Sequence, residues 1–257
     1  MSFTIAPTGS ASLLLDSLIP PATSDIIVTN LQFTGDPACA ALFSNAGNAI
    51  PDPLNEYGFP DKGFVLSTGQ SDALYYQDTP SSSSDFGRAG DSDIAQNSPF
   101  PSFDACVLEF EFSCDNSSGG GTVSINYSFG SDDYREAVDQ GLPSADIFGI
   151  LLNGNNIATV PGSTDPVTIY TINHFTETEY FVDNAGVTPP FPLFEPDGFT
   201  TGLTAEGVIT PGVNTMKIGI VDIQNGLSDS SVFIEEGASF ACIPDPDLCV
   251  GNACGGK

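Results

Sequence analysis

Two neighbouring segments alternate apolar and polar residues with a period of two, and this pattern limits the possible folds more than any other feature. In CVLEFEFSC (106–114), apolar residues alternate with Glu109 and Glu111. After the turn SSGGG (117–121), the segment TVSINYSF (122–129) alternates in the same way. Because successive side chains of a β-strand point to opposite faces, each segment is predicted to be a half-buried strand. Together they are predicted to form a hairpin around the glycine-rich turn.

The rest of the chain indicates further short strands separated by turns. With 27 Gly and 20 Pro, the composition favours turns over long helices. One short helix is predicted from Ser10 to Ile19, ended by Pro20 and Pro21. Residues 45–101 are predicted to be long surface loops around one strand, GFVLSTG (63–69). The other predicted strands are DIIVTNLQFTG (25–35), IFGILLNG (147–154), PVTIYTIN (166–173), NTMKIGIVDIQ (214–224) and SSVFIEEGASF (230–240).

This order of elements predicts an all-β protein. No connection has the pattern of a crossover helix, so an antiparallel, jelly-roll-like β-sandwich is favoured over a parallel α/β sheet. Long loops and one or two short helices complete the predicted fold. Residues 1–242 are predicted to form a single domain, and residues 243–257 a tail rich in Cys, Gly and Pro.

Six cysteines accompany a single histidine, which argues against a zinc site and for disulfides in an oxidising compartment. If Cys106 and Cys114 lie on one straight strand, they are ~26 Å apart and cannot be bonded to each other. Of the 15 connectivities that six cysteines permit, about 12 then remain. Cys249 and Cys254 are the most plausible local pair.

Charge excludes several classes of partner. The chain has 33 Asp and Glu against five Lys and Arg, a formal net charge of −28. Such a charge repels phosphate backbones and anionic lipids, so nucleic-acid binding and membrane association through charge are not expected. No apolar run reaches the ~18 residues of a membrane span, and membrane insertion is not expected either. Most carboxylates have no protein cation to pair with, which leaves metal ions or solvent to neutralise them.

Several segments, in order from about Ile26 to Phe240, resemble the choice-of-anchor L domain family. The similar segments are TNLQFTGDP, LFSNAG, GFVLSTG, VLEFEF, INYSFGSDDYREAV, DIFGILLNG, NIATVPG with PVTIYTIN, YFVDN, DGFTTGLTA, NTMKIGIVDI and DSSVFIEEGASF. The resemblance implies an extracellular or cell-surface β-rich module that is often attached by interchangeable C-terminal anchors. This chain ends in CIPDPDLCVGNACGGK, without a sorting motif or membrane helix, and departs from that pattern.

A cluster of carboxylates follows the strand that ends near Ser131. The segment FGSDDYREAVDQGLPSAD offers oxygen ligands of the kind that calcium prefers. In the matching segment of the family, the acidic pair and the later acidic residue before FG are expected features. The resulting calcium candidates are Asp132, Asp133, Glu136 and Asp146. The alternative is that Asp132 caps a helical turn, with Asp133 and Glu136 near its N-terminus.

A second acidic set lies at other strand ends, at Asp197, Asp222 and Asp229. These residues could converge on the same end of the sandwich or form a second site. Ordinary turn chemistry is the favoured alternative, because Asp before Gly or Ser is a common turn signal. Asp91 and Asp93 are interpreted in the same way.

The sequence does not indicate an enzyme. His174 is the single histidine, and no nucleophile elbow precedes it. Glu109 and Glu111 could imitate a glycosidase pair, but the polar face of a strand explains them better. The leading hypothesis is therefore a secreted, calcium-stabilised adhesion or matrix module without catalytic activity. The expected partner is a cell-surface, matrix or glycan ligand, or further copies of the chain.

Two alternatives remain open at this point. In the first, the chain is a self-assembling subunit of an extracellular filament or layer. In the second, it is a calcium-dependent, lectin-like glycan binder in which the acidic loops present an ion and Tyr134 or Tyr127 to a sugar.

Overall fold

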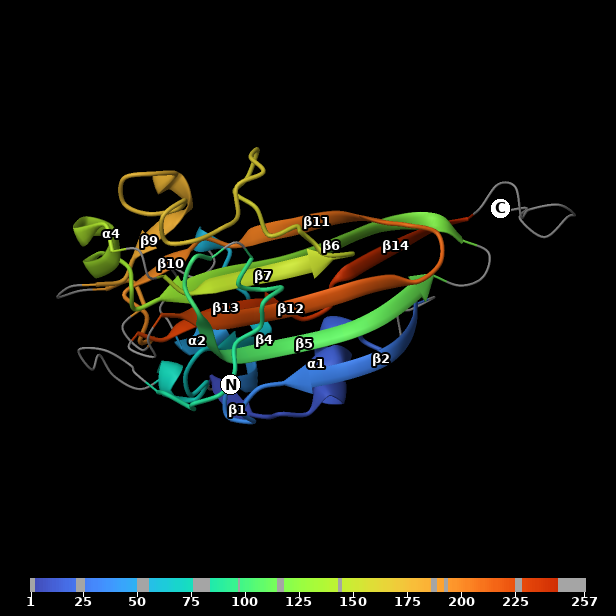
Figure 1. Cartoon of the computed structure of the whole chain (residues 1–257), viewed down its shortest axis with the longest axis horizontal. Helices are drawn as coiled ribbons and strands as arrows, with labels where there is room; N and C mark the ends of the chain where they lie inside the picture. Colours follow the sequence, from blue (N-terminus) through green and yellow to red (C-terminus); the bar gives the residue numbers. More distant parts are fainter. Residues whose placement is uncertain are drawn as a thin grey trace, which may run out of the picture.

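Two antiparallel sheets pack face to face in the computed structural model of the protein (Figure 1). The structure describes residues 3–21, 26–49, 56–75, 84–96, 98–114, 118–142, 145–185, 189–191, 194–224 and 228–244. Cys249 and Cys254 lie outside these residues. The predicted antiparallel β-sandwich is confirmed.

The larger sheet has nine strands, in the order β1-β3-β4-β13-β6-β10-β9, and β11 and β14 also pair with β6. Long β6 therefore has β13 and β14 along one side and β10 and β11 along the other. The strands are β1 (Thr4–Pro7), β3 (Ala40–Ser44), β4 (Lys62–Ser67), β6 (Ser118–Ser131), β9 (Phe181–Asp183), β10 (Gly198–Thr200), β11 (Leu203–Ile209), β13 (Ser230–Glu235) and β14 (Ser239–Pro244).

The smaller sheet has five strands, in the order β2-β5-β12-β7-β8. They are β2 (Ile26–Thr34), β5 (Ser102–Cys114), β7 (Ile147–Leu152), β8 (Asn155–Asn156) and β12 (Asn214–Ile223). The helical segments are α1 (Ala11–Leu18), α2 (Ala46–Ala49), α4 (Glu136–Gln140), η1 (Ala73–Tyr75) and η2 (Thr178–Tyr180). Figure 1 shows α4, β9 and β10 at one end of the sandwich.

The predicted hairpin between the two alternating segments is wrong. The segments do form β5 and β6, but β5 pairs with β2 and β12, whereas β6 belongs to the other sheet. Their apolar faces meet across the core, where Phe110 and Tyr127 are fully buried. Because β5 and β6 lie in different sheets, their apolar faces pack against each other. In a hairpin the two strands would lie side by side in one sheet, and their apolar faces could not cover each other.

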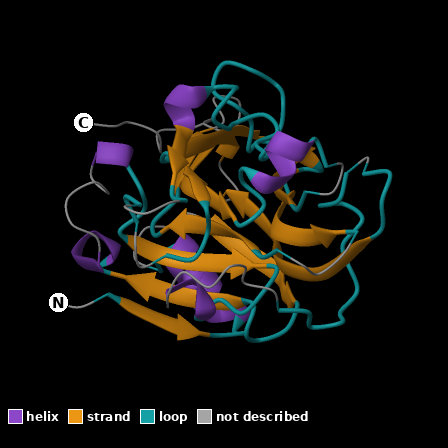
Figure 2. Ribbon diagram, turned by 90° about the vertical axis from the view of Figure 1, so that its left-hand side faces the viewer, coloured by secondary structure: helices purple, strands orange, loops and turns teal. Residues whose placement is uncertain are grey.

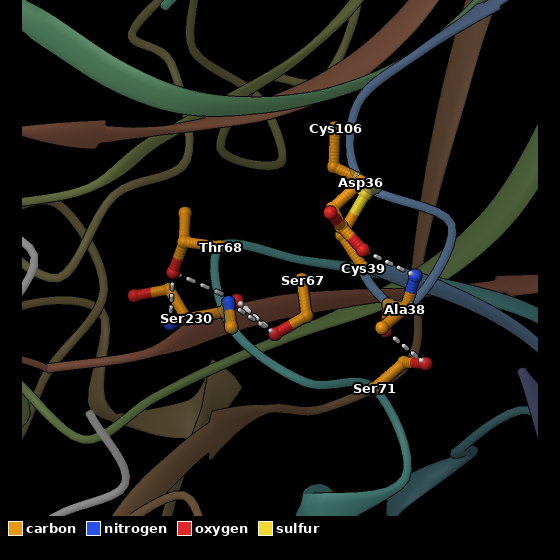
Figure 3. Close-up of a disulfide and its surroundings, with 9 residues drawn as sticks. Asp36, Ala38, Cys39, Ser67, Thr68, Ser71, Cys106 and Ser230 are labelled. Carbon is orange, nitrogen blue, oxygen red and sulfur yellow. Dashed lines mark hydrogen bonds between the residues drawn. A yellow bond between two sulfur atoms is a disulfide. The ribbon is translucent and has the colours of Figure 1, made fainter. Parts of the chain in front are cut away.

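Among the described residues, two disulfides join one sheet to the other. Cys39, just before β3, is bonded to Cys106 of β5, and Cys114 of β5 is bonded to Cys242 of β14. Cys106 and Cys114 are thus on one strand and not bonded to each other, as predicted. Figure 3 shows the first disulfide beside the paired segments of Thr68 and Ser230.

Two other predicted strands differ from the structure. The segment 166–173 is a turn, because the hydroxyl of Thr168 accepts from the backbone N–H groups of Tyr170 and Thr171 and so replaces strand pairing. The last predicted strand is divided into β13 and β14. At the break, the N–H groups of Gly237 and Ala238 donate to the carbonyls of Ser17 and Leu18, which satisfies the last turn of α1.

The predicted N-terminal helix is confirmed as α1. Ser10 caps it by accepting from the N–H of Leu13 at 3.4 Å, and the helix ends just before Pro20. Its buried residues Leu14 and Leu18 join the main core. Among the described residues between 45 and 101, β4 is the single strand, as predicted.

Further apolar clusters cover the outer faces of both sheets. Phe59 packs against Phe199 of β10 and Phe233 of β13, and also against Phe191 and Phe194 outside the strands. This cluster explains why β4 and β13 are buried on both sides. On the five-stranded sheet, Ile94 and Ala95 cover Val107 and Val221. Loops and short helices surround the strands at the α4 end (Figure 2).

Candidate functional site

Three carboxylates lie side by side where the nine-stranded sheet ends. Ser131, the last residue of β6, lies opposite Gly198 of β10 and Ser230 of β13. One position further along, this register places Asp132 between Asp197 and Asp229. The N–H of Asp132 donates to the carbonyl of Asp229 at 3.2 Å, which confirms the alignment on that side. The side chains of Asp132 and Asp229 are buried, and Asp197 is half-buried.

A second pair lies at the same end of the five-stranded sheet. Ile147 of β7 lies opposite Val221 of β12, and the next position aligns Asp146 with Asp222. Asp146 accepts from the hydroxyl of Thr68 at 3.1 Å and from the N–H of Ile223 at 3.3 Å. Asp146 and Asp222 are 3% and 2% exposed, so both carboxyl groups lie inside the protein.

Asp133 connects the two rows. Its N–H donates to the hydroxyl of Ser131 at 3.0 Å, which turns the chain after β6. Its carboxyl group accepts from Ser228 and from the backbone N–H of Asp146. We call Asp132, Asp133, Asp146, Asp222 and Asp229 the acidic end of the sandwich. Asp222 and Asp229 of the second predicted acidic set therefore lie near Asp133 and Asp146 of the first set.

Burial dominates the protonation of the acidic end. It raises the pKa of Asp133 to about 6 and that of Asp222 to about 7, and it raises the pKa of Asp146 well above its usual value. The neighbouring charges of Asp222 and Asp133 raise the pKa of Asp146 further. Asp146 and Asp222 form a hydrogen-bonded carboxyl pair, which requires one shared proton.

No basic side chain of the described residues neutralises Asp133, Asp146 or Asp222. Each described Lys and Arg is paired with other carboxylates: Lys62 with Glu236, Arg88 with Asp36, Arg135 with Asp183, and Lys217 with Asp91, Asp93 and Glu109. One oxygen of Asp222, Oδ1, is buried without a hydrogen-bond partner in the described part of the chain. In this arrangement, no three Asp, Glu, His or Cys side chains among the described residues surround a single point closely enough to hold a metal ion.

The helix-capping alternative is wrong for Asp132, although Glu136 does lie in the first turn of α4. Helix α4 begins at Glu136, its N-cap residue is Arg135, and the carbonyl rather than the side chain of Asp133 accepts from Ala137. Glu136 is exposed at the rim of the acidic end, where its charge raises the pKa of Asp133. Asp132 lies before the helix because β6 continues to Ser131.

Asp104 and Thr68 belong to the site, and neither was predicted. Asp104 is 2% exposed, and its carboxylate accepts from the N–H groups of Phe86 and Arg88 at 2.9 and 2.6 Å. Its charge also raises the pKa of Asp222. Asp104 lies where the register between β5 and β12 shifts, and nothing in the local sequence marks that irregularity.

Comparison of the sequence with protein families identifies the family of this chain. The sequence profile of the Choice-of-anchor L domain matches residues 9–241. This chain belongs to the choice-of-anchor L domain family. No curated protein and no solved structure matches it. As a choice-of-anchor L domain, it is a module of a secreted or surface protein. Among the described helices of this domain, none is long and apolar enough to span a membrane.

Three other predicted features of this choice-of-anchor L domain can now be placed. His174 lies 2.8 Å from Asp139 through Nε2, and its Nδ1 is buried without a partner among the described residues. Asp91 accepts from the N–H groups of Asp93 and Ile94, as its turn interpretation predicts. Tyr127 and Tyr134 are fully buried, so neither side chain can present itself to a sugar as the lectin hypothesis requires.

Proposed function

We propose that this choice-of-anchor L domain is a non-catalytic adhesion or matrix module whose acidic end binds calcium. The proposal rests on one observation above all. The carboxyl groups of Asp133, Asp146 and Asp222 converge from both sheets in a buried place, and no described basic side chain reaches them. At neutral pH these groups are partly ionised, and a buried negative charge is costly unless a cation compensates it.

Calcium suits this set of ligands better than other common metals. The acidic end offers carboxylate and backbone oxygens, and calcium takes six to eight oxygen ligands in flexible geometry. Zinc prefers nitrogen and sulfur, and the acidic end has neither imidazole nor thiol. Binding requires the proton shared by Asp146 and Asp222 to leave and the carboxylates to turn towards the ion.

Such an ion would hold the two sheets together where the strands end. Asp132 follows β6 and Asp229 precedes β13 of the nine-stranded sheet, whereas Asp146 precedes β7 and Asp222 lies on β12 of the five-stranded sheet. The disulfides already join the sheets elsewhere. With its loops held in one arrangement, the α4 end would present a rigid surface to a cell-surface or matrix partner, because less ordering entropy is then lost on binding.

Calorimetric titration with calcium and with magnesium tests the metal site. We expect calcium to bind and to raise the melting temperature, and the variant Asp146→Asn to lose both effects. Glu206→Gln is the matched control, because Glu206 is exposed on β11 and its replacement removes the same charge. A wild-type protein that binds no calcium and melts at the same temperature in EDTA would falsify the proposal.

The absence of catalysis is also part of the proposal. His174 supports it, because the pairing with Asp139 occupies Nε2 while Nδ1 faces the interior. Hydrolysis of a panel of ester, peptide and glycoside substrates, compared with the variant His174→Gln, checks this point. Activity that His174→Gln abolishes would show a catalytic site.

A further inference from the structure

A polar groove of about 660 Å³ crosses the outer face of the five-stranded sheet, away from the acidic end. Its floor is a row of directly paired residues on β5, β12 and β7, namely Glu109, Lys217 and Leu151. One wall includes Asp93 and Gln96, and the other includes Asn155 and Asn156. The volume lies within the range of pockets that hold small ligands.

Lys217 organises the acidic side of this groove. Its ammonium lies 3.1 Å from Asp91, 2.6 Å from Asp93 and 3.4 Å from Glu109, and the side chain is 12% exposed. Asp91 and Asp93 accept hydrogen bonds from the ammonium, and Glu109 adds an ion pair with it. Asp93 and Glu109 are 65% and 45% exposed and keep further lone pairs for a ligand. Lys217 thus fixes two hydrogen-bond acceptors in position.

The opposite wall supplies amide groups, one of which is held rigidly. Oδ1 of Asn156 accepts from the N–H groups of Ile150 and Ala158 at 3.2 and 3.0 Å. With this oxygen occupied, the amide of Asn156 can act towards a ligand as a donor through Nδ2. Asn155 uses Nδ2 on the carbonyl of Asn153 at 3.3 Å, which leaves Oδ1 as an acceptor.

The lining selects one class of ligand. Anions are repelled, because Asp91, Asp93 and Glu109 outnumber Lys217. A free metal ion has no place between these carboxylates, because the ammonium already occupies it. An apolar ligand would find Leu151 as its one large apolar contact. A ligand with several neighbouring hydroxyl groups fits this lining. Each hydroxyl can donate a hydrogen bond to the carboxylates on one side of the groove or accept one from the amides on the other side.

We propose that this groove is a calcium-independent binding site for neutral saccharides. The site is separate from the acidic end and does not depend on calcium binding there. It gives an adhesion or matrix module a ligand, and it differs from the lectin hypothesis in location and in needing neither an ion nor a tyrosine.

A glycan array of neutral and anionic oligosaccharides, probed in EDTA and again in calcium, tests the proposal. We expect neutral glycans to bind equally in both conditions and anionic glycans not to bind. The double variant Glu109→Ala, Asn155→Ala removes one carboxylate from the floor and one amide from the wall, and we expect about tenfold weaker binding or more. Glu206→Gln on the other sheet is the control and should bind as the wild type does.

Three results would overturn the proposal: no neutral glycan bound, anionic glycans bound equally well, or wild-type affinity in the double variant. Binding seen with calcium but lost in EDTA would also overturn it and would assign recognition to the acidic end. Circular dichroism and melting of each variant show that the fold is intact. The melting response to calcium is measured on the same samples, so the metal site and the groove succeed or fail independently.

Discussion

Replacing Asp222 by Asn should remove a loss of stability that the wild-type protein suffers as pH rises. Burial raises the pKa of Asp222 to about 7 in the folded protein, whereas an unfolded chain has the ordinary value of 3.8. The folded state therefore holds a proton that the unfolded state has lost between these two pH values. The resulting stabilisation is full below about pH 4 and is lost as pH rises through about 7.

The magnitude follows from the difference in pKa. A difference of about three pH units corresponds to about 4 kcal/mol of unfolding free energy, since each unit is worth about 1.4 kcal/mol. Asp222 as a whole residue is 2% exposed, so solvent screening reduces this value little. For a domain of this size, 1 kcal/mol shifts the melting temperature by about 2–4 °C, and the full effect is on the order of 10 °C.

Differential scanning calorimetry near pH 5 and near pH 8, in EDTA and in calcium, measures the effect. In EDTA near pH 8, Asp222→Asn should melt higher than the wild type, because it has no charge to bury. In calcium the order should reverse, because the variant has lost a ligand. Glu206→Gln removes the same charge from an exposed position and should follow the wild type in all four conditions.

Two results would refute the reasoning. One is a wild-type melting temperature in EDTA that is the same near pH 5 and pH 8. The other is an Asp222→Asn variant that melts below the wild type in EDTA near pH 8. The first would show that Asp222 titrates normally, and the second that the ionised group is already compensated within the protein.

Three further predictions concern the scaffold. Replacing Cys114 and Cys242 by Ser removes a disulfide with a sequence separation of 128 and should lower the free energy of unfolding, measured in urea, by about 5 kcal/mol. A decrease below about 1 kcal/mol would contradict the loop-entropy argument. The hydroxyl of Tyr134 is buried without a partner among the described residues, so Tyr134→Phe should raise the unfolding free energy by about 1 kcal/mol, and a loss would reveal a missed hydrogen bond. Phe59→Ala should lower the free energy of unfolding, measured by calorimetry, by about 3–5 kcal/mol, because Phe59 contacts four other phenylalanine rings. A smaller decrease would mean that the neighbouring rings move into the cavity left by the removed side chain.

Local patterns predicted the elements of the core well. The alternation around Glu109 and Glu111 predicted the faces of β5 and its end at Cys114, because a strand with one buried face shows a period of two, but β5 begins earlier, at Ser102. The segment 166–173 was predicted wrongly from the same kind of pattern. Its apolar residues Val167, Ile169 and Ile172 are buried as expected, but the hydroxyls of the threonines between them close turns.

The candidate site was predicted in part. Asp132, Asp133 and Asp146 were found because they lie together in an acidic segment, and Asp222 and Asp229 were noticed at strand ends. Their meeting depends on the registers of β7 with β12 and of β6 with β13. Asp104 could not be found, because its burial results from a register shift between strands far apart in sequence.

The sequence alone determined the fold class, the family and the need to neutralise an excess of carboxylates, because period-two alternation, ordered motifs and charge are properties of the chain itself. Only the tertiary structure decided which strands face each other and which cysteines are bonded. It also decided that five aspartates share one buried end while Lys217 organises a separate groove. These outcomes depend on contacts between residues distant in the chain, where burial and neighbouring charges set the chemistry of each side chain.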